Sequence, residues 1–203
     1  MQTTPHYWIR PGAAVLYVPN YVSVSDADLL YERMLTECSW QQGTLSLFGK
    51  SLPEPRLTAW CGDVAYTYSR RLLKPSPWVA GLSELRAQLH AHLPSWLGDT
   101  AELNHALINR YRDGSDGMGW HRDNEPELGE DPIIVSVSLG ATRQFVMRSR
   151  VTEGPRLSHT WSLGHGDLLV MYGQSQRTWE HALKKTVKPV GPRINVTFRA
   201  VKA

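Results

Sequence analysis

The C-terminal stretch Arg193-Ile194-Asn195-Val196-Thr197-Phe198-Arg199 indicates the fold class. Side chains alternate between the two faces of a β-strand, so its apolar residues share one face and its polar residues share the other. The polar row could be a solvated outer face. A barrel or sandwich, however, needs one face of each strand to point inward. Two arginines on an inward face need anionic partners, because an unpaired buried charge is strongly unfavourable.

An inward polar row predicts a site for a small anion. Two guanidinium groups and one amide on a single strand suit a dicarboxylate held by bidentate contacts. Asn109 and Tyr111, again two residues apart, are placed to add hydrogen bonds from a neighbouring strand.

The remainder of the chain predicts an α+β protein. From about residue 99 onward, apolar residues repeat with a period of two, in short runs separated by turns that contain glycine. Runs of this spacing indicate a sandwich or barrel, here a double-stranded β-helix (jelly-roll) core. They span residues 104–111, 133–139, 143–147, 157–163, 167–171 and 193–201.

Two helices are expected ahead of this core, bracing one of its faces. The first begins at Ser25, where Asp28 completes an approximate capping box. The second covers residues 78–93 and ends at Pro94. Residues 39–77 hold many aromatic rings and no sustained helical period, which indicates hairpins and loops that form a lid. The expected single domain, residues 1–203, therefore comprises an N-terminal arm and helix (1–38), the lid (39–77), a helix (78–98) and the core (99–203).

Composition limits the class of protein. The 203 residues are 41% hydrophobic and 20% charged, as in an ordinary globular chain, which excludes disordered and fibrous proteins. No apolar run is long enough to span a membrane. Cys38 and Cys61 cannot make a disulfide framework and favour a reducing compartment. Cytoplasm is the expected location, nucleoid-associated in a prokaryote, because no basic cluster is dense enough for a nuclear signal.

Charge is unevenly distributed, although the formal net charge is only +3. Residues 101–139 carry 3 basic and 8 acidic side chains, whereas residues 140–203 carry 11 basic and 3 acidic ones. A segment of charge −5 (3 minus 8) beside one of charge +8 (11 minus 3) suggests a polyanionic partner close to a cation site. The candidates for phosphate contacts, each of which could instead be a solvated surface charge, are Arg143, Arg148, Arg150, Arg156, Lys184, Lys185 and Lys188.

A candidate metal site comes from His121-Arg122-Asp123 together with His181. On extended backbone, the His121 imidazole and the Asp123 carboxylate point the same way. Two imidazoles and one carboxylate form the facial triad of non-haem Fe(II) oxygenases, which leaves positions open for a bidentate cosubstrate and O₂. A His-x-Asp pair also arises by chance, and His165, in an expected turn, is a rival third ligand.

Short segments in order along the chain carry a family resemblance. They are Asn109–Tyr111, His121–Glu125, Ile134–Gly140, His165–Asp167, His181 and Arg193–Arg199. They resemble the AlkB family of Fe(II)/2-oxoglutarate-dependent nucleic-acid dealkylases, and the resemblance covers nearly all of the chain from about Arg56 onward. It implies a jelly-roll catalytic core that uses Fe(II), 2-oxoglutarate and O₂ to remove methyl groups from damaged bases.

The resemblance also implies roles for single residues. The implied iron ligands are His121, Asp123 and His181. The residues implied to hold 2-oxoglutarate, two by pairing with its carboxylates and three by hydrogen bonds, are Arg193, Arg199, Asn109, Tyr111 and Asn195. Glu125 matches an acidic position near the base-binding pocket.

The lid carries a second resemblance, in Phe48–Lys50, Pro55-Arg56, Gly62-Asp63 and Tyr66–Ser69. These segments resemble the subgroup that acts on double-stranded DNA. The resemblance implies a wedge that fills the space left by a flipped nucleotide, formed by Leu47 and Phe48. It implies a base pocket above His121, lined by Tyr66 and Tyr68. Cys61 departs from the pattern, because an aromatic residue is usual there, and the segment between Asp63 and Tyr66 is one residue shorter.

The implied activity is oxidative demethylation of bases such as 1-methyladenine and 3-methylcytosine in DNA, with release of formaldehyde, succinate and CO₂. The expected partner is DNA, duplex or single-stranded, and the expected state is a monomer without membrane contact. One alternative is an RNA demethylase with the same chemistry. Another is a jelly-roll module that binds nucleic acid without turnover, against which the complete set of implied iron ligands and arginines argues.

Overall fold

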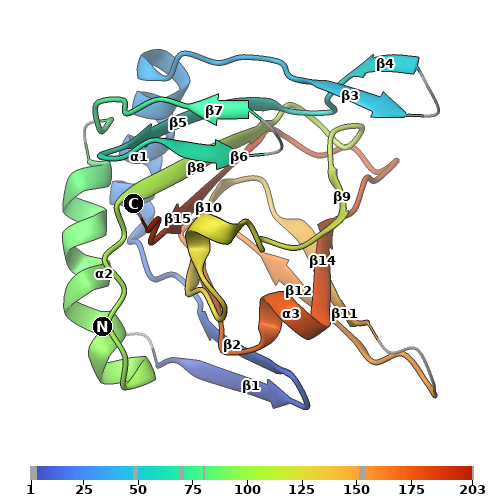
Figure 1. The fold of residues 1–203 in the computed structure, drawn as a ribbon. Coiled ribbons are helices and arrows are strands. Elements are labelled where there is room, and N and C mark those ends of the chain that lie inside the picture. The colour runs from blue at the N-terminus through green and yellow to red at the C-terminus, as the bar shows by residue number, and fades with distance from the viewer. Residues whose placement is uncertain (1–3, 48–49, 69–70, 80, 151–153, 203) are drawn as a thin grey trace.

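The computed structural model describes residues 4–47, 50–68, 71–79, 81–150 and 154–202. Two β-sheets face each other, and two long helices cover the outer face of the larger sheet (Figure 1). This arrangement is consistent with the expected jelly-roll core. Two small hairpins form separate two-stranded sheets toward the top of Figure 1.

The larger sheet has seven antiparallel strands in the order β1-β2-β13-β10-β15-β8-β5. Their bounds in that order are His6–Arg10, Ala13–Val18, Leu168–Tyr172, Ile134–Gly140, Arg193–Arg199, His105–Tyr111 and Leu57–Gly62. The smaller sheet has the order β12-β11-β14-β9. Its strands span Ser158–Leu163, Arg143–Ser149, Trp179–Leu183 and Met118–His121.

The remaining elements are short. One hairpin pairs β3 (Thr44–Leu47) with β4 (Lys50–Pro53), and the other pairs β6 (Tyr66–Tyr68) with β7 (Arg71–Leu73). Two single-turn helices, η1 (Pro126–Leu128) and α3 (Ser175–Thr178), lie in connections of the core. Both hairpins fall within the segment expected to form a lid.

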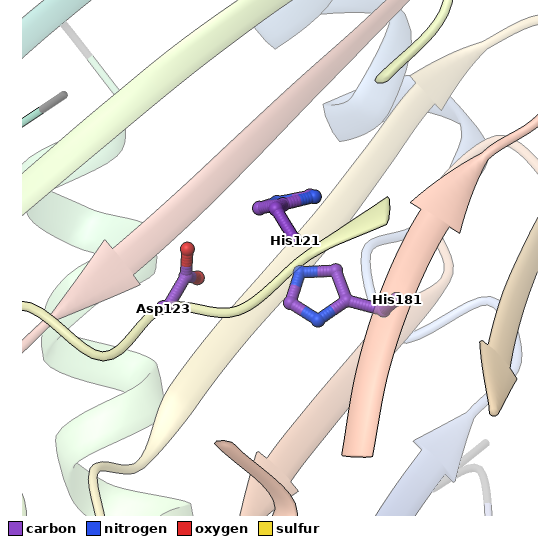
Figure 2. Close-up of side chains that lie close together, drawn as sticks. All are labelled: His121, Asp123 and His181. Carbon is purple, nitrogen blue, oxygen red and sulfur yellow. The ribbon is translucent and has the colours of Figure 1, made fainter. Parts of the chain in front are cut away.

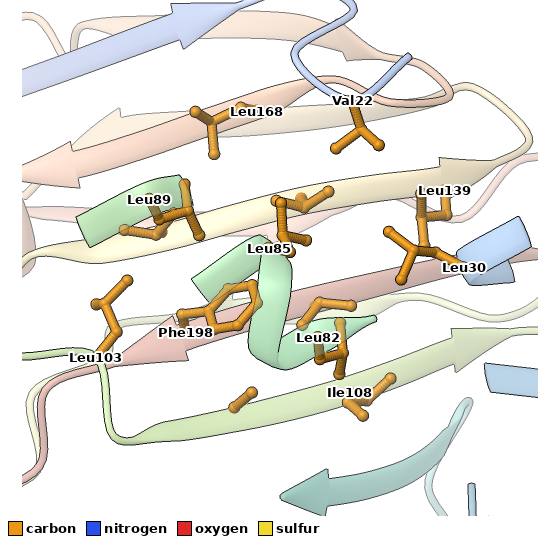
Figure 3. Packing of buried hydrophobic residues seen from close by; sticks show 14 of the residues in the cluster. Val22, Leu30, Leu82, Leu85, Leu89, Leu103, Ile108, Leu139, Leu168 and Phe198 are labelled. Atoms are coloured by element: carbon orange, nitrogen blue, oxygen red, sulfur yellow. The ribbon is translucent and has the colours of Figure 1, made fainter. Parts of the chain in front are cut away.

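Strand β15 is buried on both faces, so the solvated-face alternative for its polar row is wrong. Its apolar residues pack under the helices, as Figure 3 shows for Phe198. Its polar residues face the smaller sheet and line a cavity between the sheets. The register with β8 sets Arg193 opposite Tyr111 and Asn195 opposite Asn109, which brings the predicted anion-binding residues together.

The two long helices differ from the sequence prediction at their ends. Helix α1 (Val24–Glu37) is capped by Ser23 rather than by Ser25, because the Ser23 hydroxyl accepts a hydrogen bond from the backbone N–H of Asp26. Helix α2 (Leu82–Leu97) begins four residues later than expected and continues past Pro94. The Pro94 carbonyl still accepts the N–H of Gly98, whose left-handed backbone ends the helix.

The helices cover the sheet through apolar residues along one face of each, among them Leu30 of α1 and Leu82, Leu85 and Leu89 of α2 (Figure 3). Leu85, Leu89 and Leu93 of α2 are all buried. Trp78, expected in the same helix, instead precedes it and stacks on Phe198. None of the described helices combines the length and apolar character needed to cross a membrane.

The core sheet includes strands that the sequence placed in the arm and in the lid. β1 and β2 form a hairpin at one edge of the larger sheet. Pro5, Pro11 and Pro19 do not prevent this pairing, because they lie just outside the two strands, where they remove no ladder hydrogen bond. Gly12, at φ +73°, makes the turn between them. β5 forms the opposite edge by pairing with β8. Of the strands in the segment expected to form a lid, only those of the two hairpins therefore lie outside the core sheet.

Candidate active site

The three predicted metal ligands converge between the sheets (Figure 2). His121 ends β9 and pairs in register with His181 on the neighbouring β14, while Asp123 follows two residues after β9. Their ligand atoms all lie within 4.8 Å of one another. Asp123 Oδ1 is buried without a hydrogen-bond partner among the described residues. Two imidazole nitrogens and an uncompensated carboxylate oxygen fit an Fe(II) ion.

Both histidines are held in the form that binds metal. The backbone carbonyl of Gly119, 2.8 Å from His121 Nδ1, can only accept, so this nitrogen carries the proton and Nε2 is free to ligate. Burial lowers the pKa of His121 and lowers the pKa of His181 to about 3. Neutral imidazole is the form that coordinates metals.

Asp123 is held ionised by an ion pair that sequence reasoning did not anticipate. Arg199 Nη2 lies 3.0 Å from Asp123 Oδ2, and both side chains are buried. Burial alone would raise the pKa of Asp123, but the positive charge of Arg199 holds it below its usual range. The structure therefore places Arg199 beside the metal ligands, whereas its pairing with 2-oxoglutarate stays a prediction.

Arg193, the other predicted arginine, has no carboxylate within ion-pair distance among the described residues. Its Nη2 donates to Ser138 Oγ and Asn195 Oδ1, both at 2.8 Å. Its Nε is buried and unpaired among the described residues. Burial lowers the pKa of Arg193 to about 10, so the guanidinium remains charged at neutral pH. A buried cation without a counter-ion fits a carboxylate of 2-oxoglutarate.

One cavity joins the metal ligands to the Arg193 end of the strand. Besides several apolar side chains, its lining includes Tyr68, Asn109, Tyr111, His121, Asp123, Ser136, His181, Arg193, Asn195, Thr197 and Arg199. All five residues predicted to hold 2-oxoglutarate therefore share the cavity with the triad. Ser136 and Ser138 were missed, although the alternation rule applied to the stretch 134–140 would have placed both on the inward face.

The predicted base pocket is assembled in part. Tyr68 lines the cavity, whereas Tyr66 packs behind it against His105, with ring centroids 4.9 Å apart. Burial and the negative charge of Asp123 raise the pKa of Glu125. The base-binding role of Tyr66, Tyr68 and Glu125 stays a prediction.

The predicted wedge falls largely outside the described residues. Phe48 is not described, and of Leu47 only the backbone is, as the last residue of β3. Cys61, the departure from the family pattern, lies in the cluster under the helices. Its neighbour Trp60 packs in the cluster between the sheets. The cysteine therefore replaces no ring of the pocket.

The structure excludes two candidates that the sequence had left open. His165 is no ligand of the triad, because its Nδ1 accepts the N–H of Gly140 in a turn. Arg143 makes no phosphate contact, because it is buried and donates to backbone carbonyls of Asp113, Asp116 and Lys184. Arg148 pairs with Glu180 at 2.5 Å. The candidates that remain exposed are Arg150, Arg156, Lys184, Lys185 and Lys188.

Comparison with known proteins agrees with this geometry. The sequence profile of the 2OG-Fe(II) oxygenase superfamily matches residues 14–199. Mouse alpha-ketoglutarate-dependent dioxygenase alkB homolog 3 is 36% identical over 92% of this chain and 66% of its own length. Human DNA oxidative demethylase ALKBH2 is 37% identical over 87% of this chain and 69% of its own length.

A solved structure shares the fold. The structure of OsALKBH1 has a TM-score of 0.66 at 18% identity, covering 97% of this chain and 99% of that one. The fold, the triad and the profile define a 2OG-Fe(II) oxygenase. Within that class, the chain belongs to the AlkB family of Fe(II)- and 2-oxoglutarate-dependent dioxygenases. It spans about 66% of the length of alkB homolog 3.

Proposed function

We propose that this protein demethylates DNA bases such as 1-methyladenine and 3-methylcytosine by oxidation. One observation carries the proposal: the metal triad and an uncompensated buried arginine share a cavity that Tyr68 also lines. The sequence relatives support the DNA substrate, since ALKBH2 is named a DNA oxidative demethylase. The products are the repaired base, formaldehyde, succinate and CO₂.

The residues of the cavity form two groups, one for the metal and one for 2-oxoglutarate. His121, His181 and Asp123 would hold Fe(II), and Arg193 would take the far carboxylate of 2-oxoglutarate with help from Asn109 and other hydrogen-bonding neighbours. When bound, iron with 2-oxoglutarate and O₂ supplies the oxidising power that hydroxylates an N-methyl carbon. Arg199 keeps Asp123 charged and oriented throughout.

The substrate base must leave the stack to reach this cavity, which costs a few kcal/mol and least where a lesion already disrupts pairing. Stacking on Tyr68 would offset about 1–3 kcal/mol of that cost. A base methylated at adenine N1 or cytosine N3 is cationic, and aromatic rings and the nearby Glu125 carboxylate favour a cation. Surrounding apolar side chains exclude water from the reacting centre.

Formaldehyde and succinate release from methylated oligonucleotides tests the proposal. The protein should release both from 1-methyladenine in DNA when Fe(II) and 2-oxoglutarate are supplied, and Asp123→Ala should reduce both to background. Single-stranded DNA, duplex DNA and RNA of the same sequence should be compared. Turnover of RNA alone would move the substrate class to RNA. Absence of formaldehyde with all three would contradict the proposal.

A further inference from the structure

Arg56 connects the hairpin β3–β4 to the active-site cavity and has no part in the function described so far. Its side chain is only 3% exposed. Its Nη2 lies 3.0 Å from Glu54 Oε2, and its Nε donates to Asn109 Oδ1 at 3.0 Å. Glu54 immediately follows β4, whereas Asn109 lines the cavity. One buried guanidinium therefore spans the distance between the lid and the site.

The contact with Asn109 fixes which end of its amide faces the cavity. A guanidinium carries only donors, so the amide oxygen must be the atom that meets Arg56. The NH₂ group of Asn109 is thereby turned away from Arg56 and left for another acceptor. Asn109 lies opposite Asn195 on β15, whose own oxygen accepts from Arg193. Because Asn109 lines the cavity, its NH₂ group is left to donate to a carboxylate bound there.

The contact with Glu54 fixes Arg56 to the foot of the hairpin. The N–H of Glu54 donates to the Gly43 carbonyl at 2.8 Å, and its carbonyl accepts from Gln42 Nε2 at 2.9 Å. A Cβ on Gly43 would come within 2.8 Å of the Glu54 carboxyl carbon, so the close approach depends on glycine. Glu54 is therefore held by the segment that leads into β3 as well as by its own strand β4.

We propose that Arg56 is a positioning residue that couples occupancy of the 2-oxoglutarate subsite to the position of the β3–β4 hairpin. The proposal rests on the proposed function, in that 2-oxoglutarate occupies this cavity. A carboxylate that accepts from Asn109 restrains the amide, and through it Arg56 and Glu54. Coupling of two sites is reciprocal, so a ligand that binds the restrained hairpin more tightly strengthens binding of the cosubstrate by the same factor as the cosubstrate strengthens its own binding.

Two binding measurements without turnover test this coupling. 2-Oxoglutarate is titrated calorimetrically into protein loaded with Mn(II), and amide hydrogen exchange of residues 44–47 and 50–53 is followed with and without it. In the unaltered protein, 2-oxoglutarate should slow hairpin exchange. Glu54→Gln should keep the affinity for 2-oxoglutarate within about twofold but abolish this slowing, because only the link to the hairpin is weakened. Arg56→Lys should abolish the slowing of hairpin exchange and also weaken 2-oxoglutarate binding about tenfold.

A surface ion pair supplies matched controls. Arg86 and Asp63 lie 2.6 Å apart, and neither lines the cavity. Arg86→Lys and Asp63→Asn should leave both readouts unchanged. Two outcomes would overturn the coupling but not the proposed function. One is that 2-oxoglutarate still slows hairpin exchange in Glu54→Gln. The other is that 2-oxoglutarate binds to the unaltered protein without slowing hairpin exchange. Failure of the unaltered protein to bind 2-oxoglutarate would overturn the proposed function as well.

Discussion

Arg193 and Arg199 lie on the same face of one strand, yet their surroundings give them different chemistry. Arg199 has a carboxylate partner in Asp123, and its pKa is raised above the usual range because the attraction of that carboxylate outweighs burial. Arg193 meets only neutral groups at hydrogen-bond distance among the described residues, and burial lowers its pKa. A ligand carboxylate gains most at the arginine that lacks a counter-ion.

Substitution at each arginine should therefore affect a different step. Arg193→Gln should raise the KM for 2-oxoglutarate by about tenfold or more and leave metal affinity unchanged. Arg199→Gln should weaken both, since Asp123 loses the charge that keeps it ionised. Mn(II) titration and the 2-oxoglutarate dependence of succinate formation separate the two effects. Unchanged metal affinity in Arg199→Gln would contradict the role given to Arg199.

His105 predicts a pH dependence of stability. Its ring is fully buried, neither nitrogen has a partner among the described residues, and burial lowers its pKa to about 3. An unfolded chain takes up this proton near pH 6.5, so the stabilisation is complete above that pH and is lost as pH falls toward 3. The free energy of unfolding should fall by about 1 kcal/mol per pH unit more steeply than in His105→Phe between pH 6 and 4.

Denaturant unfolding at several pH values measures that slope. The His105 ring packs edge-to-face with the ring of Tyr66, so phenylalanine keeps the packing while it removes the titrating group. His6→Phe, at an exposed position on β1, is the control and should retain the slope of the unaltered protein. Equal slopes in His105→Phe and the unaltered protein would show that His105 is not responsible.

At the scale of elements, the sequence predicts long strands and their faces well. The alternation in 193–199 set its polar residues on one face, which the structure buries, and β8, β10, β11, β12 and β13 fall within one to two residues of their predicted bounds. β9 and β14, which carry the candidate metal-ligating histidines, are not predicted as strands, because neither Met-Gly-Trp-His nor Trp-Glu-His-Ala-Leu shows a regular alternation of apolar and polar residues. These two strands form through pairing with segments far away in the sequence, and β5 joins the larger sheet in the same way by pairing with β8. Such long-range pairing cannot be predicted from the local sequence.

The β3–β4 hairpin is the element from which we predict a preference for duplex DNA. In the sequence, Phe48 stands between its two strands and lies outside the described residues; the family resemblance predicts that it fills the space vacated by a flipped base. Single strands have no partner base to replace. Phe48→Ala should therefore reduce turnover of a methylated duplex about tenfold or more while single-stranded turnover changes little. Equal losses on both substrates would contradict the wedge.

Over the whole molecule, burial of some basic residues means that the charge exposed on the surface differs from the charge counted from the sequence. Of the basic residues in the C-terminal third, Arg143, Arg193 and Arg199 are buried, and their side chains contact groups inside the protein. The excess charge available to a polyanion is therefore smaller than composition suggests. It remains at the exposed positions Arg150 and Arg156, near the start of β14, and Lys184, Lys185 and Lys188, beyond its end, which together we call the basic surface.

The basic surface should set the salt dependence of DNA binding. Each phosphate contact contributes about 0.9 to the slope of log K against log salt concentration on duplex DNA. Lys184→Gln combined with Lys185→Gln should therefore reduce the slope by up to about 2, and leave 2-oxoglutarate affinity unchanged. Fluorescence anisotropy of a labelled duplex at increasing salt measures it. Arg33→Gln, on helix α1 behind the larger sheet, is the control. If the control lowers the slope as much as the double variant, DNA does not lie along the basic surface.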